Sequence, residues 1–171
     1  MLDFIHSAAR GIQRGGFHTP NHRWVISSAL AKAWQTWPHM ENPEPCLESY
    51  LKEGLDIDAE GVWSERSAAI YDGVSDCAML LLHEVLGRED FLQAARMNLD
   101  FNSAMLQPNG TIETAMSTRQ DQGQEIFPHQ LGAAFYGWPA SPIRIFICLP
   151  PKPFFKGMKA AWWAAFGQFM C

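Results

Sequence analysis

Apolar residues recur at helical spacing through most of the first 106 positions of the chain. Five helices are predicted on this basis, over residues 2–14, 20–37, 45–54, 67–86 and 89–106. Thr19 can cap the second helix, Pro20 suits its first turn, and Pro38 would end it. Gly87 would likewise end the fourth helix, which carries the strongest apolar pattern.

Beyond the fifth predicted helix the pattern weakens. Pro108-Asn109-Gly110 predicts a turn, residues 111–116 read as a short strand or extended loop, and residues 128–137 could open a further helix. Short loops and the scarcity of strand signals favour consecutive helical hairpins in a mainly α-helical fold. No fixed-period repeat of the TPR or HEAT type is visible.

The chain divides by composition into residues 1–138 and residues 139–171. The first part holds 18 acidic and 9 basic residues, a net charge of −9, whereas the second holds four basic residues and no acid. The second part also contains Pro-Pro-Lys-Pro and ends in aromatic and small residues. We interpret it as an atypical, artefactual end produced by a frameshift or truncation. The alternative is a basic amphipathic tail that packs on a partner or a membrane surface.

Composition bounds the function classes. With 47% hydrophobic and 18% charged residues, the 171-residue chain is globular, and its net charge of −5 argues against a nucleic-acid partner. No run approaches the roughly 20 apolar residues of a membrane helix, and no signal peptide is visible. A cytoplasmic location is the default, with a periplasmic or secreted one if the N-terminus is truncated. The four cysteines show neither zinc spacing nor a disulfide framework.

The segment His18–Trp24 places polar side chains at the start of the second predicted helix. Asn21 supplies an amide, His22 a titratable ring, and Arg23 a guanidinium that fits a carboxylate. The positive end of the helix dipole adds to this arrangement, which suits an acidic sugar. The alternative is an ordinary N-cap segment with solvated charges.

A second segment, residues 60–73, carries Trp63 and Glu65 in a loop and Tyr71 on the following helix. A phenol can act as general acid or base, although a lone tyrosine is more often a core residue with a satisfied hydroxyl. Two interpretations are likewise open for the seven Trp and eleven Phe residues of the chain: they form a sugar-binding face, or they fill the core. Arg119 could bind a sulfate or carboxylate, or lie in a solvated loop.

Together, Asn21 in NHRW and Tyr71 in GVWSERSAAIY resemble the heparinase II/III and alginate lyase group of polysaccharide lyases. The resemblance covers about residues 15–130, and the two residues lie 50 positions apart. It implies consecutive hairpins of an (α/α) toroid, of which this chain holds only part. It further implies an acidic polysaccharide or oligosaccharide as substrate, no cofactor or metal, and possible self-association through the open edge of the toroid.

In the mechanism that this resemblance implies, the uronate is cleaved by β-elimination. Asn21 and Arg23 pair with the uronate carboxylate, and Tyr71 or His22 takes the C5 proton. The candidate catalytic and substrate-binding residues are therefore Tyr71, His22, Asn21, Arg23, Trp63, Glu65 and Arg119. Two alternatives stay open: an inactive fragment or interaction module, and a glycoside hydrolase that pairs Asp72 with Glu65 or Asp76.

Overall fold

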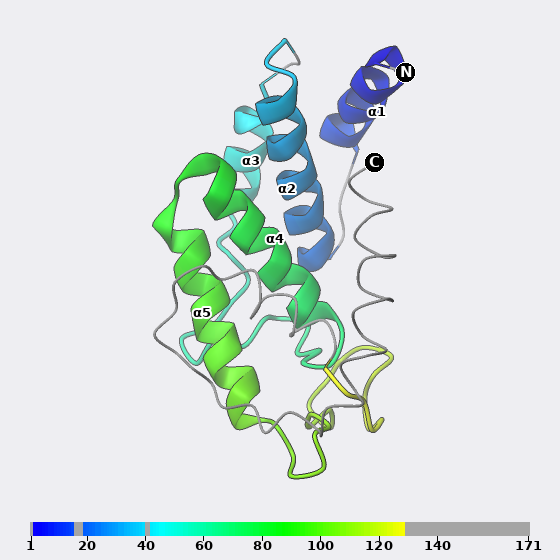
Figure 1. Cartoon of the computed structure of the whole chain (residues 1–171), viewed down its shortest axis with the longest axis vertical. Helices are drawn as coiled ribbons and strands as arrows, with labels where there is room; N and C mark the ends of the chain where they lie inside the picture. Colours follow the sequence, from blue (N-terminus) through cyan, green and yellow to red (C-terminus); the bar gives the residue numbers. More distant parts are fainter. Residues whose placement is uncertain (1, 16–18, 40–41, 129–171) are drawn as a thin grey trace, which may run out of the picture. The chain divides into compact units, whose positions relative to one another are not determined.

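A computed structural model describes residues 2–15, 19–39 and 42–128 (Figure 1). These residues form five helices and no strand, which confirms the mainly α-helical class. The helices are α1 (Leu2–Arg14), α2 (Pro20–Thr36), α3 (Glu44–Leu51), α4 (Tyr71–Leu86) and α5 (Glu89–Ala104). The predicted helix at 128–137, apart from Pro128, and the basic tail at 139–171 lie outside the described residues.

Helix α4 begins four residues later than its apolar pattern suggests. The carbonyl oxygen of Ser67 accepts hydrogen bonds from the backbone N–H groups of Ile70 (3.2 Å) and Asp72 (3.0 Å), which closes a turn ahead of the helix. The Ser67 hydroxyl also accepts the N–H of Tyr71 at 3.2 Å. Tyr71 is consequently the first residue of α4. At the other end Gly87 takes the left-handed conformation (φ 67°) and ends the helix as expected.

Helices α2 and α4 pack side by side and run in the same direction (Figure 1). Near their C-terminal ends, Lys32 of α2 forms an ion pair with Glu84 of α4 at 3.3 Å. Near their N-terminal ends, the charge of His22 on α2 lowers the pKa of Glu65. Glu65 lies six residues before Tyr71, the first residue of α4. The parallel packing therefore places the beginnings of α2 and α4 at the same end of the helix pair.

Helix α5 packs against α4 in the opposite direction. Asn98 and Asn102, in the last turns of α5, both donate side-chain hydrogen bonds to the carboxylate of Asp72 in the first turn of α4, at 3.1 and 3.3 Å. The hydrophobic core lies among α2, α4 and α5 and includes Trp24, Trp63, Ala78, Met79, Leu82, Phe91 and Ala95. Among the described residues, no helix is long and apolar enough to cross a membrane.

The loop before α4 is held against α5 at Gly61. Its φ is +86°, and a Cβ atom there would lie 2.3 Å from the carbonyl oxygen of Met97. The Gly61 carbonyl accepts a hydrogen bond from Asn98 at 2.8 Å. Only glycine combines this backbone conformation with so close an approach.

We expect Gly61→Ala to lower the free energy of unfolding by at least about 2 kcal/mol, because strain and a backbone clash add together. Gly54→Ala is the matched control, since Gly54 has a similar φ of +88° but open space where the methyl group of alanine would lie. Urea denaturation of both variants measures the difference. Equal losses would show that the contact with Met97 is unimportant.

The segment after α5 returns to the beginning of α4. Antiparallel bridges join Ile112 to Leu106, across the predicted turn at 108–110, and to Ile126 further along the chain. The region around 111–116 is therefore extended, with isolated bridges in place of a regular strand. Its continuation, residues 117–121, lies against the start of α4, where the candidate site is found.

Candidate functional site

Tyr71 is the centre of the candidate site. Its ring is half-buried and lies under the guanidinium of Arg119, whose Cζ atom is 4.6 Å from the ring centroid. The Tyr71 hydroxyl accepts a hydrogen bond from Gln120 Nε2 at 2.9 Å. Two consecutive residues of the 117–121 segment therefore hold the ring face and the hydroxyl of Tyr71. This arrangement differs from that of a fully enclosed core tyrosine.

Arg119 also faces Glu65. The closest atoms of this ion pair, Arg119 Nη1 and Glu65 Oε1, are 3.8 Å apart, which leaves room for another partner. The pKa of Arg119 is raised, first by its hydrogen bond with Tyr71 and then by the charges of Glu65 and Asp121. The buried Nε of Arg119 has no hydrogen-bond partner among the described residues.

Glu65 connects Arg119 to the beginning of α2. Burial is the largest influence on this carboxyl group and raises its pKa, while the charges of Arg119 and His22 act in the opposite direction. The charge of Asp56 raises the pKa of Glu65 further. Electrostatic contacts thus link His22 to Glu65, Glu65 to Arg119, and Arg119 to Tyr71.

The first turn of α2 carries Asn21 and His22. Thr19 is the N-cap residue and Pro20 the first helical residue, as predicted, but the Thr19 hydroxyl makes no bond to the helix backbone. It donates instead to Asn21 Oδ1 at 2.7 Å. Asn21 is buried and His22 is exposed. Among the described residues no hydrogen bond joins Asn21 to Glu65 or Tyr71. His18 lies outside the described residues.

Arg23 has partners within the protein. Its guanidinium forms ion pairs with Glu53, at 2.5 Å, and with Asp56, and it lies 5.5 Å from the ring centroid of Trp24. The residue is 7% exposed. Both terminal nitrogens of the guanidinium are therefore paired with carboxylates of the protein. Arg23 in this way connects α2 to the loop that precedes the site.

Trp63 belongs to the core. The side chain is 2% exposed, and its indole N–H donates to Asp76 Oδ1 at 3.0 Å. In this position the ring supports the loop that carries Glu65 and presents no face on which a sugar could stack.

The carboxylates of the hydrolase alternative lie inside the protein. Asp72 and Asp76 are 1% and 0% exposed. Burial raises the pKa of Asp72 to about 6 and also raises that of Asp76 well above its usual range. A hydrolase needs two carboxyl groups that a sugar can reach. The observed burial and hydrogen bonds give Asp72 and Asp76 a structural part in this molecule.

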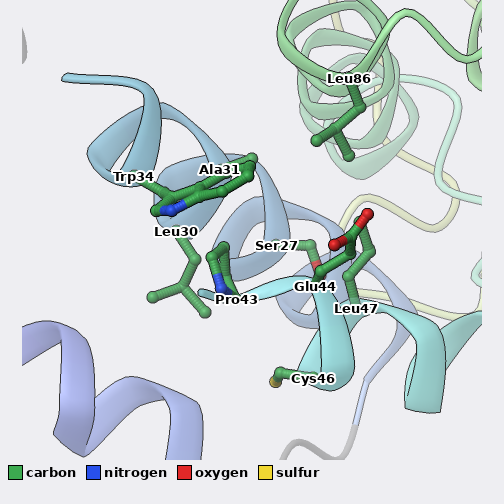
Figure 2. A pocket seen from close by; sticks show the side chains of 9 residues that line it. All are labelled: Ser27, Leu30, Ala31, Trp34, Pro43, Glu44, Cys46, Leu47 and Leu86. Atoms are coloured by element: carbon green, nitrogen blue, oxygen red, sulfur yellow. The ribbon is translucent and has the colours of Figure 1, made fainter. Parts of the chain in front are cut away.

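A separate pocket lies at the other end of the α2–α4 pair (Figure 2). Trp34 and Leu30 of α2, Leu47 of α3 and Leu86 at the end of α4 supply most of its apolar lining. None of the predicted site residues lines it. The candidate site around Tyr71 and this pocket are therefore separate.

The sequence pattern does not reveal the residues that join the 117–121 segment to α4. They are Ser67, Ser117, Gln120 and Asp121. The signals available are weak: Ser67 precedes Tyr71 by four residues, and Ser117 precedes Asp121 by the same spacing. Such spacings are common in turns, so they do not indicate a contact between segments about 50 residues apart.

Comparison with known protein families, with curated proteins and with solved structures finds no match to this chain. Within the described ranges, no group of three or more His, Cys, Asp or Glu side chains is placed to hold a metal ion.

Proposed function

We propose that this chain carries the proton-transfer site of a polysaccharide lyase that cleaves uronate-containing glycans by β-elimination. The observation that supports this most strongly is the Tyr71 side chain, held by Arg119 on its ring face and by Gln120 at its hydroxyl. Glu65 faces Arg119, and the charge of His22 acts on Glu65. A phenol, an imidazole and a guanidinium together are the groups that the elimination requires.

In the proposed reaction His22 removes the C5 proton of the uronate. The electron pair of that C–H bond forms the C4=C5 double bond as the C4–O4 bond breaks, and Tyr71 gives its proton to the departing O4 oxygen. Removal of the C5 proton places negative charge on the uronate carboxylate, where a fixed cation is most effective. Arg119 is that cation, because its side chain is 28% exposed and its ion pair with Glu65 is loose.

Asn21 is the second proposed contact for the uronate carboxylate. Its Oδ1 is occupied by Thr19, which orients the amide and leaves Nδ2 as the donor. Arg23 has a supporting part in this proposal, since Glu53 and Asp56 hold its guanidinium. It maintains the loop on which Glu65 lies.

The proposed scaffold is a part of an (α/α) toroid. Two features support it: α2 and α4 are parallel neighbours, and α5 returns antiparallel to α4. A toroid repeats such units around an axis, with the beginnings of like-directed helices at one end. An open edge in this arrangement would favour self-association of the chain.

The test is to incubate the full chain with heparan, chondroitin, alginate and ulvan-type polysaccharides. Ultraviolet absorbance reports the new C4=C5 double bond, and a reducing-end assay reports every cleavage. We expect both signals to rise together on at least one substrate. Reducing ends without the double bond would replace elimination by hydrolysis, and silence in both assays would contradict the proposal.

A further inference from the structure

One buried carboxylate joins the two chain segments that hold Tyr71 and Arg119. Asp121 is 0% exposed. Its Oδ2 accepts a hydrogen bond from Ser67 Oγ at 2.8 Å, and its Oδ1 accepts one from Ser117 Oγ at 2.5 Å. Ser67 lies in the turn that precedes α4, four residues before Tyr71, whereas Ser117 lies in the segment that returns after α5. Oδ2 therefore joins the returning segment, to which Asp121 itself belongs, to the segment before α4, and Oδ1 holds Ser117 within the returning segment.

Each of the two serines also accepts a backbone hydrogen bond from one member of the Tyr71–Arg119 pair. Ser67 Oγ accepts the N–H of Tyr71 at 3.2 Å, and Ser117 Oγ accepts the N–H of Arg119 at 3.1 Å. Both hydroxyl protons are directed to Asp121, which leaves the hydroxyl oxygens free to accept. Asp121 thus fixes the backbone of both residues through one hydroxyl group each.

The neighbouring contacts are of a different kind. Thr118 bonds to the carbonyl oxygen of Glu65 through its N–H (3.4 Å) and its hydroxyl (2.8 Å). These bonds attach the returning segment to the loop before α4, but they reach neither Tyr71 nor Arg119. Among the described residues, the Asp121 carboxylate alone joins the backbones of that pair through side chains.

We propose that Asp121 is a positioning residue, which sets the Arg119 guanidinium over the Tyr71 ring and Gln120 at the Tyr71 hydroxyl. A carboxylate can accept hydrogen bonds from both serines at once. The Asn side chain has one acceptor oxygen, so Asp121→Asn would disrupt at least one of the two serine hydrogen bonds. The geometric part of this proposal is independent of the reaction, and its effect on catalysis rests on the proposed function.

The geometric part is tested on the full chain labelled with 3-fluorotyrosine. The chain has three tyrosines, so the fluorine NMR spectrum is simple, and Tyr71→Phe assigns the Tyr71 signal. Arg119→Ala gives the shift that follows loss of the guanidinium. We expect Asp121→Asn to move the Tyr71 signal in that same direction. Ser117→Ala, which removes one link only, is expected to do so even if Asp121→Asn fails to fold.

Asp76→Asn is the matched control, because Asp76 is also 0% exposed but bonds to Trp63. It should leave the Tyr71 signal in place, whatever it does to stability. A Tyr71 signal that is unchanged in both Asp121→Asn and Ser117→Ala would overturn the proposal. A signal that moves as expected in a protein without lyase activity would support the positioning and contradict the proposed function.

On an active substrate, Asp121→Asn is expected to lower kcat at least about tenfold, since small misplacements of catalytic groups have effects of this size or larger. KM should change much less. In an Arg119→Ala background the same substitution should have little further effect on kcat. An equal effect in both backgrounds would show that Asp121 acts only on general stability.

Discussion

Replacing Tyr71 by phenylalanine is expected to lower the rate of double-bond formation about 1000-fold, within the range typical for loss of a general acid. The substitution removes one oxygen atom and leaves the ring under Arg119. The proton for the O4 oxygen then has to come from water. Initial rates of wild type and Tyr71→Phe on the same substrate measure the effect.

Two controls separate this loss from unfolding. The Tyr71 hydroxyl bonds to Gln120, which is exposed, and to the half-buried Arg119, so its removal should change the free energy of unfolding by only about 1 kcal/mol. Tyr50→Phe, on α3, should retain the wild-type rate. A Tyr71→Phe protein that is folded and fully active would remove Tyr71 from the reaction.

The second large effect concerns the buried carboxyl group of Asp72. Burial raises its pKa to about 6, aided by the charges of Asp121 and Glu65 and opposed by hydrogen bonds from Asn98 and Asn102. An unfolded aspartate has a pKa of about 3.9. Because the folded-state pKa is the higher one, this group stabilises the fold fully below about pH 4. The contribution is lost as the pH rises through about 6.

We therefore expect the free energy of unfolding of Asp72→Asn to rise relative to that of wild type by about 2 kcal/mol between about pH 4 and about pH 7. Asparagine has nearly the same shape and does not titrate, so the difference between the two proteins reports the titration of Asp72 together with the effect of its charge on Asp76. Urea denaturation at the two pH values provides the measurement. A difference that is the same at both would mean that Asp72 does not change its charge in this interval.

Asp90→Asn is the control of opposite sign. The pKa of Asp90 is lowered, chiefly by its hydrogen bond with Arg88, so any stabilisation from this exposed residue is lost as the pH falls. Its substitution should therefore matter more near neutral pH than in acid. The two aspartates together distinguish a specific effect of burial from a general effect of net charge.

Much of the secondary structure follows from local pattern. The apolar spacing, Pro20 at the start of α2 and Gly87 after α4 locate these helices to within a few residues. The start of α4 departs from the pattern because Ser67 accepts the first N–H groups of the helix, and this leaves Tyr71 at its beginning. A hydrophobic pattern cannot show that event, since Ala68, Ala69 and Ile70 are as apolar as a helix requires.

The site depends on contacts between distant segments, and the sequence predicts it less completely. Tyr71, Glu65 and Arg119 lie together as three of the predicted residues, although the loop that brings Arg119 back is fixed by Asp121, which local spacing does not reveal. Arg23 and Trp63 are predicted from the sequence as substrate contacts, but in the structure their side chains bond to other residues of the protein. A guanidinium and an indole suit a sugar, but they suit protein carboxylates and a hydrophobic core equally well.

A double-mutant cycle on the rate of elimination tests whether the beginnings of α2 and α4 form one catalytic site. The rates of wild type, His22→Ala, Arg119→Ala and the double variant are compared on one uronate substrate. Residues that act as a unit show strongly non-additive effects. We predict a double variant little slower than the slower single variant. Losses that multiply independently, or no elimination by the wild type, would contradict the account.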